Sequence, residues 1–157
     1  NGYQNPQQLG VDRWAALLGV WQLAPGAAAV VADCGSALTV DVLDERGQHL
    51  GGIIAPGLGM AAEAFFGRTG RAHETDARAC EDGRATCTAD AVASGALFAA
   101  AGAIALMRTH AAGLGAVPTA WLTGGDAEVV APMLEGPVRV VADLVFEGMA
   151  VMLEGEP

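Results

Sequence analysis

The spacing of apolar and polar residues changes several times along the chain, and each change predicts a different element. Apolar residues at helical spacing over residues 11–23 predict a helix that ends at Pro25-Gly26. Short continuous or alternating apolar segments, bounded by polar residues and glycines, predict strands. The expected strands cover residues 27–32, 38–43, 48–55, 118–122 and 138–141. Further helices are expected over residues 57–66, 89–112, 127–134 and 144–153, with Thr88 as the N-cap of the longest.

The order of these elements predicts the class of fold. The turn Asp44-Glu45-Arg46-Gly47 joins the second and third strands and favours a hairpin, and the later strands alternate with helices. This order predicts an α/β fold with a mixed five-stranded sheet flanked by helices. A Rossmann fold does not fit, because the chain has no GxGxxG sequence and no early strand–helix–strand unit. The pattern resembles the ribonuclease H-like half-domain of sugar kinases, actin and Hsp70.

Composition and charge narrow the classes of function. The 157 residues suit one domain, and 52% of them are hydrophobic, which excludes a disordered chain. The net charge is −10, and the eight basic residues are all arginine. The absence of lysine excludes a Schiff base or a Walker-type phosphate loop within this chain, and the acidic balance argues against nucleic-acid binding. We therefore expect a cytoplasmic protein that acts on small molecules.

The cysteines and the longest apolar run exclude two further classes. Cys34, Cys80 and Cys87 lack the spacing of a zinc site, and their odd number argues against a disulfide framework. The run over residues 91–107 is rich in alanine and glycine and shorter than a usual membrane span, so a buried helix of a soluble protein is expected. No signal peptide is recognised at the start of the sequence.

Two clusters carry acidic residues next to groups that bind ligands. Asp12, beside Arg13 at the start of a helix, would act as a base while the arginine anchors an anion; alternatively it stabilises the helix dipole. In the second cluster, Asp33 could hold a cation, Gly35 would let the backbone approach a phosphate, and Ser36 offers a hydroxyl. Thr39 and Asp41 come later in this cluster, and their spacing of two residues places both side chains on the same face of the predicted strand. A tight turn that needs a glycine is the alternative for the second cluster.

Two glycine pairs and the histidines complete the candidates. Gly124-Gly125, followed by Asp126, leaves room for a flat ring or a phosphate, or else forms a tight connection with Asp126 as N-cap. Gly51-Gly52, with the Pro56-Gly57 step, lines a pocket or turns the chain. The three histidines share no spacing, so each is interpreted as a surface or a hydrogen-bonded core residue.

Taken together, these clusters resemble the type III pantothenate kinase family, in family order over residues 1 to about 148. The matching stretches are Asn1-Gly2-Tyr3 with Pro6, Leu9-Gly10-Val11-Asp12-Arg13-Trp14, Asp33-Cys34-Gly35-Ser36-Ala37-Leu38-Thr39-Val40-Asp41, Gly51-Gly52 through Pro56-Gly57, Thr88 with Ala91 and Gly95, Thr123-Gly124-Gly125-Asp126-Ala127, and Asp143-Leu144-Val145-Phe146-Glu147-Gly148. The resemblance implies ATP-dependent phosphorylation of the primary hydroxyl of pantothenate, the first step of coenzyme A synthesis.

The resemblance also implies a role for each matching residue. Asp12 is similar to the proton acceptor of the family, and Asp33 to the ligand of a monovalent cation, potassium or ammonium. The nucleotide, with Mg²⁺, would meet Ser36 and Gly35 together with Gly124 and Gly125. The positions similar to substrate-contacting residues are Tyr3, Gly10, Val11, Asp12, Arg13 and Thr88.

The resemblance also predicts how the chain is organised. Residues 1–26 would form an interdomain segment with a substrate-binding helix, and residues 27–157 a C-terminal ribonuclease H-like domain. A homodimer is expected, with substrate sites near the subunit interface and neither nucleic acid nor membrane as a partner. Serine at position 36 replaces the usual threonine of the family and keeps the hydroxyl.

The chain shows no counterpart of the phosphate loop with which the family begins, so we expect the chain alone to be inactive. The alternative function is a non-catalytic, nucleotide-binding accessory factor on the same fold.

Overall fold

A five-stranded mixed sheet organises the computed structural model, which describes residues 2–70, 76–113 and 117–154. The strands lie in the order β3-β2-β1-β4-β5. β1 pairs antiparallel with β2, and β2 with β3, whereas β4 runs parallel to both β1 and β5. Their bounds are β1 Ala29–Cys34, β2 Ala37–Leu43, β3 His49–Pro56, β4 Thr119–Thr123 and β5 Val138–Val140. The predicted mixed α/β fold is confirmed. The structure does not describe Asn1, residues 71–75 between the helices expected over 57–66 and 89–112, residues 114–116 or residues 155–157.

The helices follow the predicted order, with three differences, the first being that α2 continues to Thr69 instead of ending near residue 66. Their bounds are α1 Val11–Leu23, α2 Leu58–Thr69, α3 Thr88–Ala112, α4 Ala127–Val130 and α5 Leu144–Glu154, with 3₁₀ turns η1 at Pro6–Gln8 and η2 at Ala131–Met133. α4 is shorter than expected because Pro132 has no N–H to continue an α-helical ladder, and the chain tightens into η2. The expected N-cap was also wrong. Cys87 holds that position, its sulfur accepting the Asp90 N–H at 3.5 Å, and Thr88 is the first helical residue.

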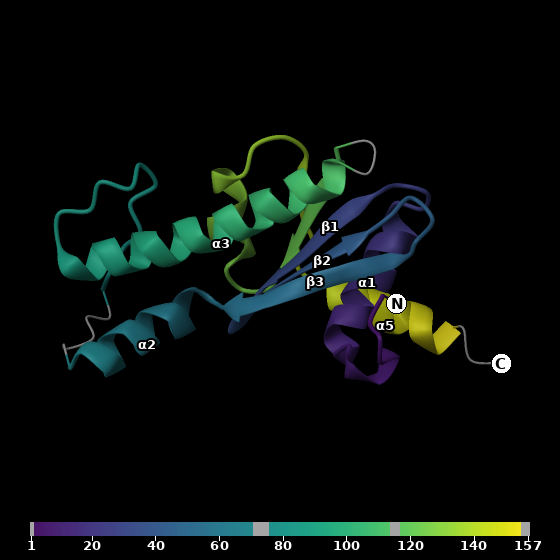
Figure 1. Ribbon diagram of the computed structural model, residues 1–157, viewed down its shortest axis with the longest axis horizontal. Coiled ribbons are helices and arrows are strands. Elements are labelled where there is room, and N and C mark those ends of the chain that lie inside the picture. The colour runs from purple at the N-terminus through teal and green to yellow at the C-terminus, as the bar shows by residue number, and fades with distance from the viewer. Residues whose placement is uncertain (1, 71–75, 114–116, 155–157) are drawn as a thin grey trace.

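Helices cover both faces of the sheet (Figure 1). Side chains alternate along each strand, so neighbouring strand residues enter different cores. On β1, Val30 and Ala32 pack toward α3, whereas Val31 packs toward α1. Asp33 follows the same alternation as Val31 and therefore belongs to the α1 face.

Two glycines let α1 and α5 cross at short range. A Cβ at Gly19 would lie 2.5 Å from the Leu144 carbonyl oxygen, and one at Gly148 would overlap the Ala15 carbonyl. The crossing holds α1 against the sheet, where Leu17 is buried with Trp121 of β4. This packing fixes the direction of the α1 N-terminus. The division of the chain at residue 26 stays a prediction.

By length and composition α3 is apolar enough to cross a membrane, although core helices of soluble proteins meet the same criterion. In this fold one side of α3 is buried on the sheet through Leu97, Ala100 and Ile104. The N-terminal half of α3 extends past the sheet beside α2 (Figure 1).

Candidate functional site

Asp12 lies in the first turn of α1, where it is exposed to solvent. Its Oδ1 accepts the backbone N–H of Arg13 at 2.8 Å. A negative charge in the first turn is stabilised by the helix dipole. Gly10 precedes this turn, and a Cβ there would come within 2.6 Å of the Asp12 Oδ1. The sequence therefore presents a carboxylate that is oriented by its own helix and open on its other side.

Asp33 lies near the end of β1 and shares its surroundings with Asp12. Burial raises the pKa of the Asp33 carboxyl above its ordinary value, and the negative charge of Asp12 raises it further. Gly124 follows β4 and lies so close that a Cβ there would be 2.5 Å from the Asp33 Oδ1. Among the described residues, no hydrogen-bond donor or cationic side chain pairs with the Asp33 carboxylate. The fold thus brings two carboxylates from distant parts of the sequence to one edge of the sheet.

A crevice of about 530 Å³ opens at this edge, where β1 and β4 end. Its walls come from the β1–β2 turn, the β4–α4 connection and the first turns of α2. The lining residues are Cys34, Gly35, Ser36, Gly59, Met60, Glu63, Gly125 and Asp126. The Gly57 N–H donates to the Ser36 carbonyl at 3.0 Å and fastens the start of α2 to the β1–β2 turn. The structure therefore places Gly35, Ser36 and Gly125 together, as expected from the sequence, with Gly124 beside them against Asp33.

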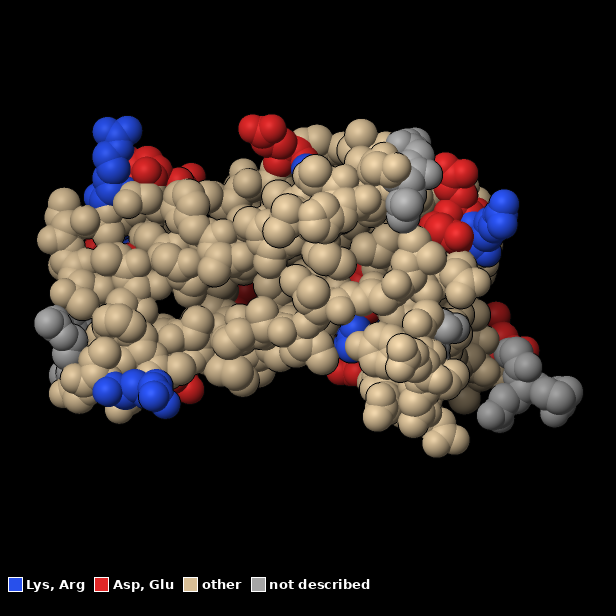
Figure 2. Space-filling model, in the orientation of Figure 1, with Lys and Arg blue, Asp and Glu red and all other residues tan. Residues whose placement is uncertain are grey.

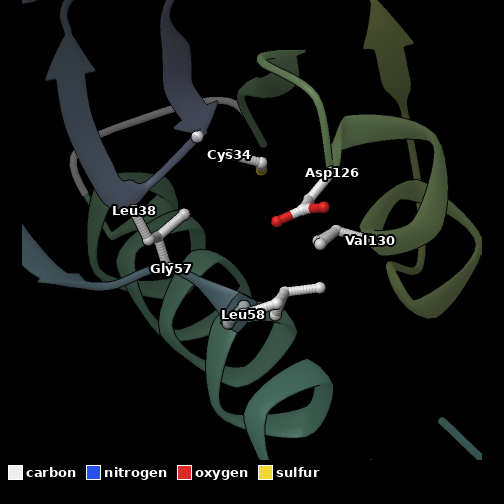
Figure 3. A pocket seen from close by; sticks show the side chains of 8 residues that line it. Cys34, Leu38, Gly57, Leu58, Asp126 and Val130 are labelled. Carbon is white, nitrogen blue, oxygen red and sulfur yellow. The ribbon is translucent and has the colours of Figure 1, made fainter. Parts of the chain in front are cut away.

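A narrower pocket lies behind the crevice, and Figure 3 shows the Asp126 carboxylate pointing into it. Asp126 precedes α4 but makes no side-chain cap hydrogen bond. Cys34 lies on the same wall, and burial, with the charges of Asp33 and Asp126, raises the pKa of its thiol to about 12. Burial and the two charges therefore disfavour the thiolate, which is the nucleophilic form of a cysteine.

Arg13 is buried in an ion pair that joins α1 to the sheet. Its Nε donates to the Asp41 Oδ2 at 2.8 Å and its Nη2 to the Oδ1 at 2.6 Å. Its Nη1 donates to the Tyr3 hydroxyl at 2.7 Å. The hydrogen bonds to Asp41 raise the pKa of Arg13 above its ordinary value. The sequence pattern placed Asp41 in one cluster with Asp33, but its direct partner in the structure is Arg13.

His49 belongs to the same buried network, although spacing alone did not single it out. Its Nε2 lies 2.7 Å from the Asp41 Oδ1, and its Nδ1 lies 3.3 Å from the Gly2 N–H. The hairpin register pairs Leu43 with His49, and Asp41 lies two residues before Leu43 on the same sheet face. A register shift between Val42 and Leu43 interrupts the regular alternation here, so the sequence pattern alone did not identify the pair. His49 is thus a hydrogen-bonded core residue, one of the two interpretations offered by the sequence.

Thr88 lies apart from these residues, in an apolar groove of about 560 Å³ between α2 and α3. The groove is lined by Ala61, Phe65, Thr88, Ala91, Val92, Gly95, Ala96 and Ala99. Figure 2 shows it as a hollow in a surface that carries few charged side chains. None of the other expected site residues lines this groove. The chain by itself therefore does not bring Thr88 to Asp12 and Asp33.

Within the described parts of the chain, no group of three or more histidine, cysteine, aspartate or glutamate side chains could hold a metal ion. A divalent cation would therefore need ligands from outside these residues, such as phosphates and water.

Comparisons with known proteins bear on this geometry. A family model described as type III pantothenate kinase matches residues 1–110. Proteins named type III pantothenate kinase from Nitrosospira multiformis and Alkalilimnicola ehrlichii are 42% and 40% identical, over 95% and 96% of this chain. The chain spans only 56% and 60% of the length of these two relatives.

A solved structure also resembles the chain. It is described as a conserved putative Baf family transcriptional activator from Campylobacter jejuni. It superposes with a TM-score of 0.69 and 28% sequence identity, covering 95% of this chain and 65% of the other.

Proposed function

Since this chain belongs to the type III pantothenate kinase family, we propose that it takes part in the ATP-dependent phosphorylation of pantothenate to 4′-phosphopantothenate. This reaction would be the first step of coenzyme A synthesis. The observation that carries the proposal is that Asp12 acts electrostatically on Asp33 at the end of β1, where the following residues, from Cys34 to Ser36, line the crevice. One carboxylate is open to solvent and the other is half-buried, so the two suit different tasks.

Asp12 would be the proton acceptor. The oxygen of the primary hydroxyl attacks the γ-phosphorus of ATP, the bond from that phosphorus to the β-phosphate oxygen breaks, and ADP leaves. The hydroxyl proton passes to a carboxylate oxygen of Asp12. Phosphoryl transfer has a loose transition state, so positioning and charge neutralisation matter more than the strength of the base. Asp12 is held by the Arg13 N–H and keeps its second oxygen open for this step.

Asp33 would hold a monovalent cation, potassium or ammonium. A half-buried carboxylate with a raised pKa gains most from a nearby positive charge, because the charge offsets both burial and the repulsion from Asp12. The cation would also reduce the repulsion between these carboxylates and the phosphates of ATP. Such a site would distinguish cations by their size. The quantity to measure is therefore the difference in activity between potassium and sodium salts.

ATP would occupy the crevice, with the Ser36 hydroxyl and the backbone at Gly35 facing the phosphates. Gly124 and Gly125 would leave room for the flat adenosine. Mg²⁺ would bind mainly to the phosphates and water, since this chain offers no cluster of three ligands within its described residues. None of the residues that line the crevice is cationic, so neutralisation of the phosphates must come largely from bound cations and from further protein groups.

Pantothenate would bind beside Asp12, in contact with Tyr3, Gly10, Val11 and Arg13. Thr88 is the remaining substrate position, and its groove lies on a different part of the chain. A homodimer would resolve this separation, with the α2–α3 pair of one copy completing the substrate site of the other. Exposed apolar side chains on these helices, Met60 at 46% and Phe98 at 44%, suit such an interface.

We place the reaction in the cytoplasm, with neither nucleic acid nor membrane as a partner. The alternative, a non-catalytic accessory factor, is not favoured, because the curated relatives are named as kinases.

The test is to express the complete reading frame that encodes this chain and to assay 4′-phosphopantothenate by mass spectrometry with ATP, Mg²⁺ and potassium. Asp12→Asn should lower kcat by roughly 10²–10⁴-fold, the usual contribution of a general base, while the KM for ATP changes little. Asp82→Asn is the matched control, since Asp82 is an exposed aspartate whose partner among the described residues is exposed Arg84. A wild-type protein that forms no product, or an Asp12→Asn variant at full rate, would contradict the proposal.

A further inference from the structure

Resting on the proposed function, we propose that Asp41 is a positioning residue that fixes the Arg13 guanidinium for the acceptor substrate, with His49 orienting Asp41 in turn. Neither residue would touch the reacting atoms. Their contribution would be to hold a substrate-contacting cation, and the helix start that carries Asp12, in one geometry.

Asp41 is the centre of this network and is almost completely buried, at 2% exposure. Its two oxygens accept the Nε and Nη2 donors of Arg13 in a bidentate pair, at 2.8 and 2.6 Å. Bidentate pairing of planar groups fixes orientation as well as distance. Gly52 lies opposite Asp41 in the sheet, and a Cβ there would overlap the Asp41 Oδ1. The carboxylate is therefore confined on the side of β3 by backbone.

His49 supplies the third donor to Asp41. Its Nδ1 accepts the Gly2 N–H, so this nitrogen carries no proton and the ring proton is on Nε2. The Nε2–H then donates to the Asp41 Oδ1 at 2.7 Å. A histidine whose second nitrogen is occupied by a backbone donor has one tautomer and one ring orientation. His49 thus orients Asp41, which orients Arg13.

The geometry of Arg13 reaches the proposed base directly. The backbone N–H of Arg13 donates to Asp12, while its side chain is tied to Asp41 and to the Tyr3 hydroxyl. A guanidinium has five N–H groups, and these contacts use three of them. No further acceptor for the other two is found among the described residues. They remain to bind the acceptor substrate, and their direction is set by Asp41.

Stability alone gives a weak reason for this arrangement. Charges buried as a pair lose hydration, and apolar residues of similar volume are often at least as stabilising. A second buried arginine among the described residues can be compared with Arg13. Arg108, also buried, donates to the carbonyls of Glu135 and Pro137 and joins α3 to the loop before β5. It contacts neither carboxylate of the proposed site, so it provides a control for the loss of a buried arginine contact.

The experiment compares four variants of the complete protein: Asp41→Asn, His49→Leu, His49→Gln and the control Arg108→Met. Asp41→Asn should lower kcat/KM for pantothenate by roughly 10–100-fold, the scale of a hydrogen bond to a charged group, with the KM for ATP within about twofold. His49→Leu should show a smaller loss of the same kind. His49→Gln keeps an N–H donor for Asp41 and should recover most of it. Arg108→Met should lower the melting temperature without changing kcat/KM for pantothenate.

Nitrogen NMR of the 157-residue chain provides a readout that does not depend on activity. The His49 ring should show a protonated Nε2 and an unprotonated Nδ1, and Asp41→Asn should shift the Arg13 Nε–H signal. An Asp41→Asn protein with wild-type kcat/KM for pantothenate, or a His49 ring protonated on Nδ1 at neutral pH, would overturn this role and leave the proposed function standing. A wild-type protein without pantothenate kinase activity would overturn both.

Discussion

Replacing Gly124 by alanine should destabilise the fold at the point where the two carboxylates and the crevice meet. Gly124 has φ +89°, a backbone conformation that alanine adopts only with strain. A Cβ there would also lie 2.5 Å from the Asp33 Oδ1 and 2.6–2.7 Å from the Cys34 carbonyl group. The Cys34 oxygen already accepts the Asp126 N–H at 2.9 Å, which holds the loop against the end of β1. The loop therefore cannot shift away from Asp33 and Cys34 without breaking this hydrogen bond.

The magnitude follows from these two effects. An unfavourable backbone conformation costs about 1–3 kcal/mol, and forced overpacking a further ~1–3 kcal/mol. The reduced freedom of the unfolded chain offsets about 0.4–1 kcal/mol of this. The net loss in the free energy of unfolding is then about 1–6 kcal/mol. At roughly 2–4 °C per kcal/mol, the melting temperature should fall by about 2–24 °C.

The neighbouring residue provides the control. Gly125 has no positive φ, and a Cβ on it would meet nothing within 4 Å. Gly125→Ala should therefore leave the melting temperature unchanged or raise it by about 1–3 °C. The measurement is thermal unfolding of the 157-residue chain, followed by circular dichroism in one buffer for all three proteins. If Gly124→Ala melts within a degree of Gly125→Ala, the close approach of this loop to Asp33 is not a feature of the folded protein.

Three further outcomes are expected. Activity of the complete protein should be higher in potassium or ammonium than in sodium, and Asp33→Ala should remove both the difference and most of the rate; equal rates in the two salts would argue against a cation at Asp33. The pKa of Asp33 is raised in the folded state, so the native protein binds the proton more tightly and loses stability as the pH rises through that pKa. Asp33→Asn should therefore raise the melting temperature relative to wild type more at pH 7 than at pH 3, and a constant difference would refute the assigned burial. The 157-residue chain assayed alone should form no 4′-phosphopantothenate, because its crevice has no cationic lining residue and each lost phosphate contact reduces the rate by about 10²–10³-fold; turnover equal to that of the complete protein would show the account of the nucleotide site to be wrong.

Local patterns were sufficient for the elements that depend on local chemistry. The helix over 11–23 has the predicted bounds, because its apolar spacing and the Pro25-Gly26 stop act within a few residues. The capping of α3 was misassigned by one position, since threonine is the more usual N-cap and a cysteine sulfur is a weak acceptor. The strand ends differ from the prediction by one or two residues. Strand ends depend on pairing with neighbours, which no local pattern contains.

For the candidate site too, the residue types were evident from the sequence, whereas their arrangement in space was not. Asp12, Asp33, Ser36 and the Gly124-Gly125 pair were recognisable from the sequence, because turns and helix starts require particular residue types there. The proximity of Asp33 and Ser36 to the glycine pair was decided by the parallel pairing of β1 with β4, which brings residues about ninety positions apart to one edge of the sheet. The place of Asp12 depends on the packing of α1 against the sheet.

The pairing of Arg13 with Asp41 and His49 was decided only by the tertiary structure. Asp41 is 28 residues from Arg13 in the sequence, and the contact exists because α1 packs on the sheet face that Asp41 occupies. The composition excluded lysine chemistry and the residue pattern predicted the fold, since both depend on residue types in sequence order. Which charges meet, and which of them are buried, depends on strand register and on the crossing of α1 with α5 at Gly19 and Gly148. Those long-range contacts form only when the whole sheet and its helices are assembled.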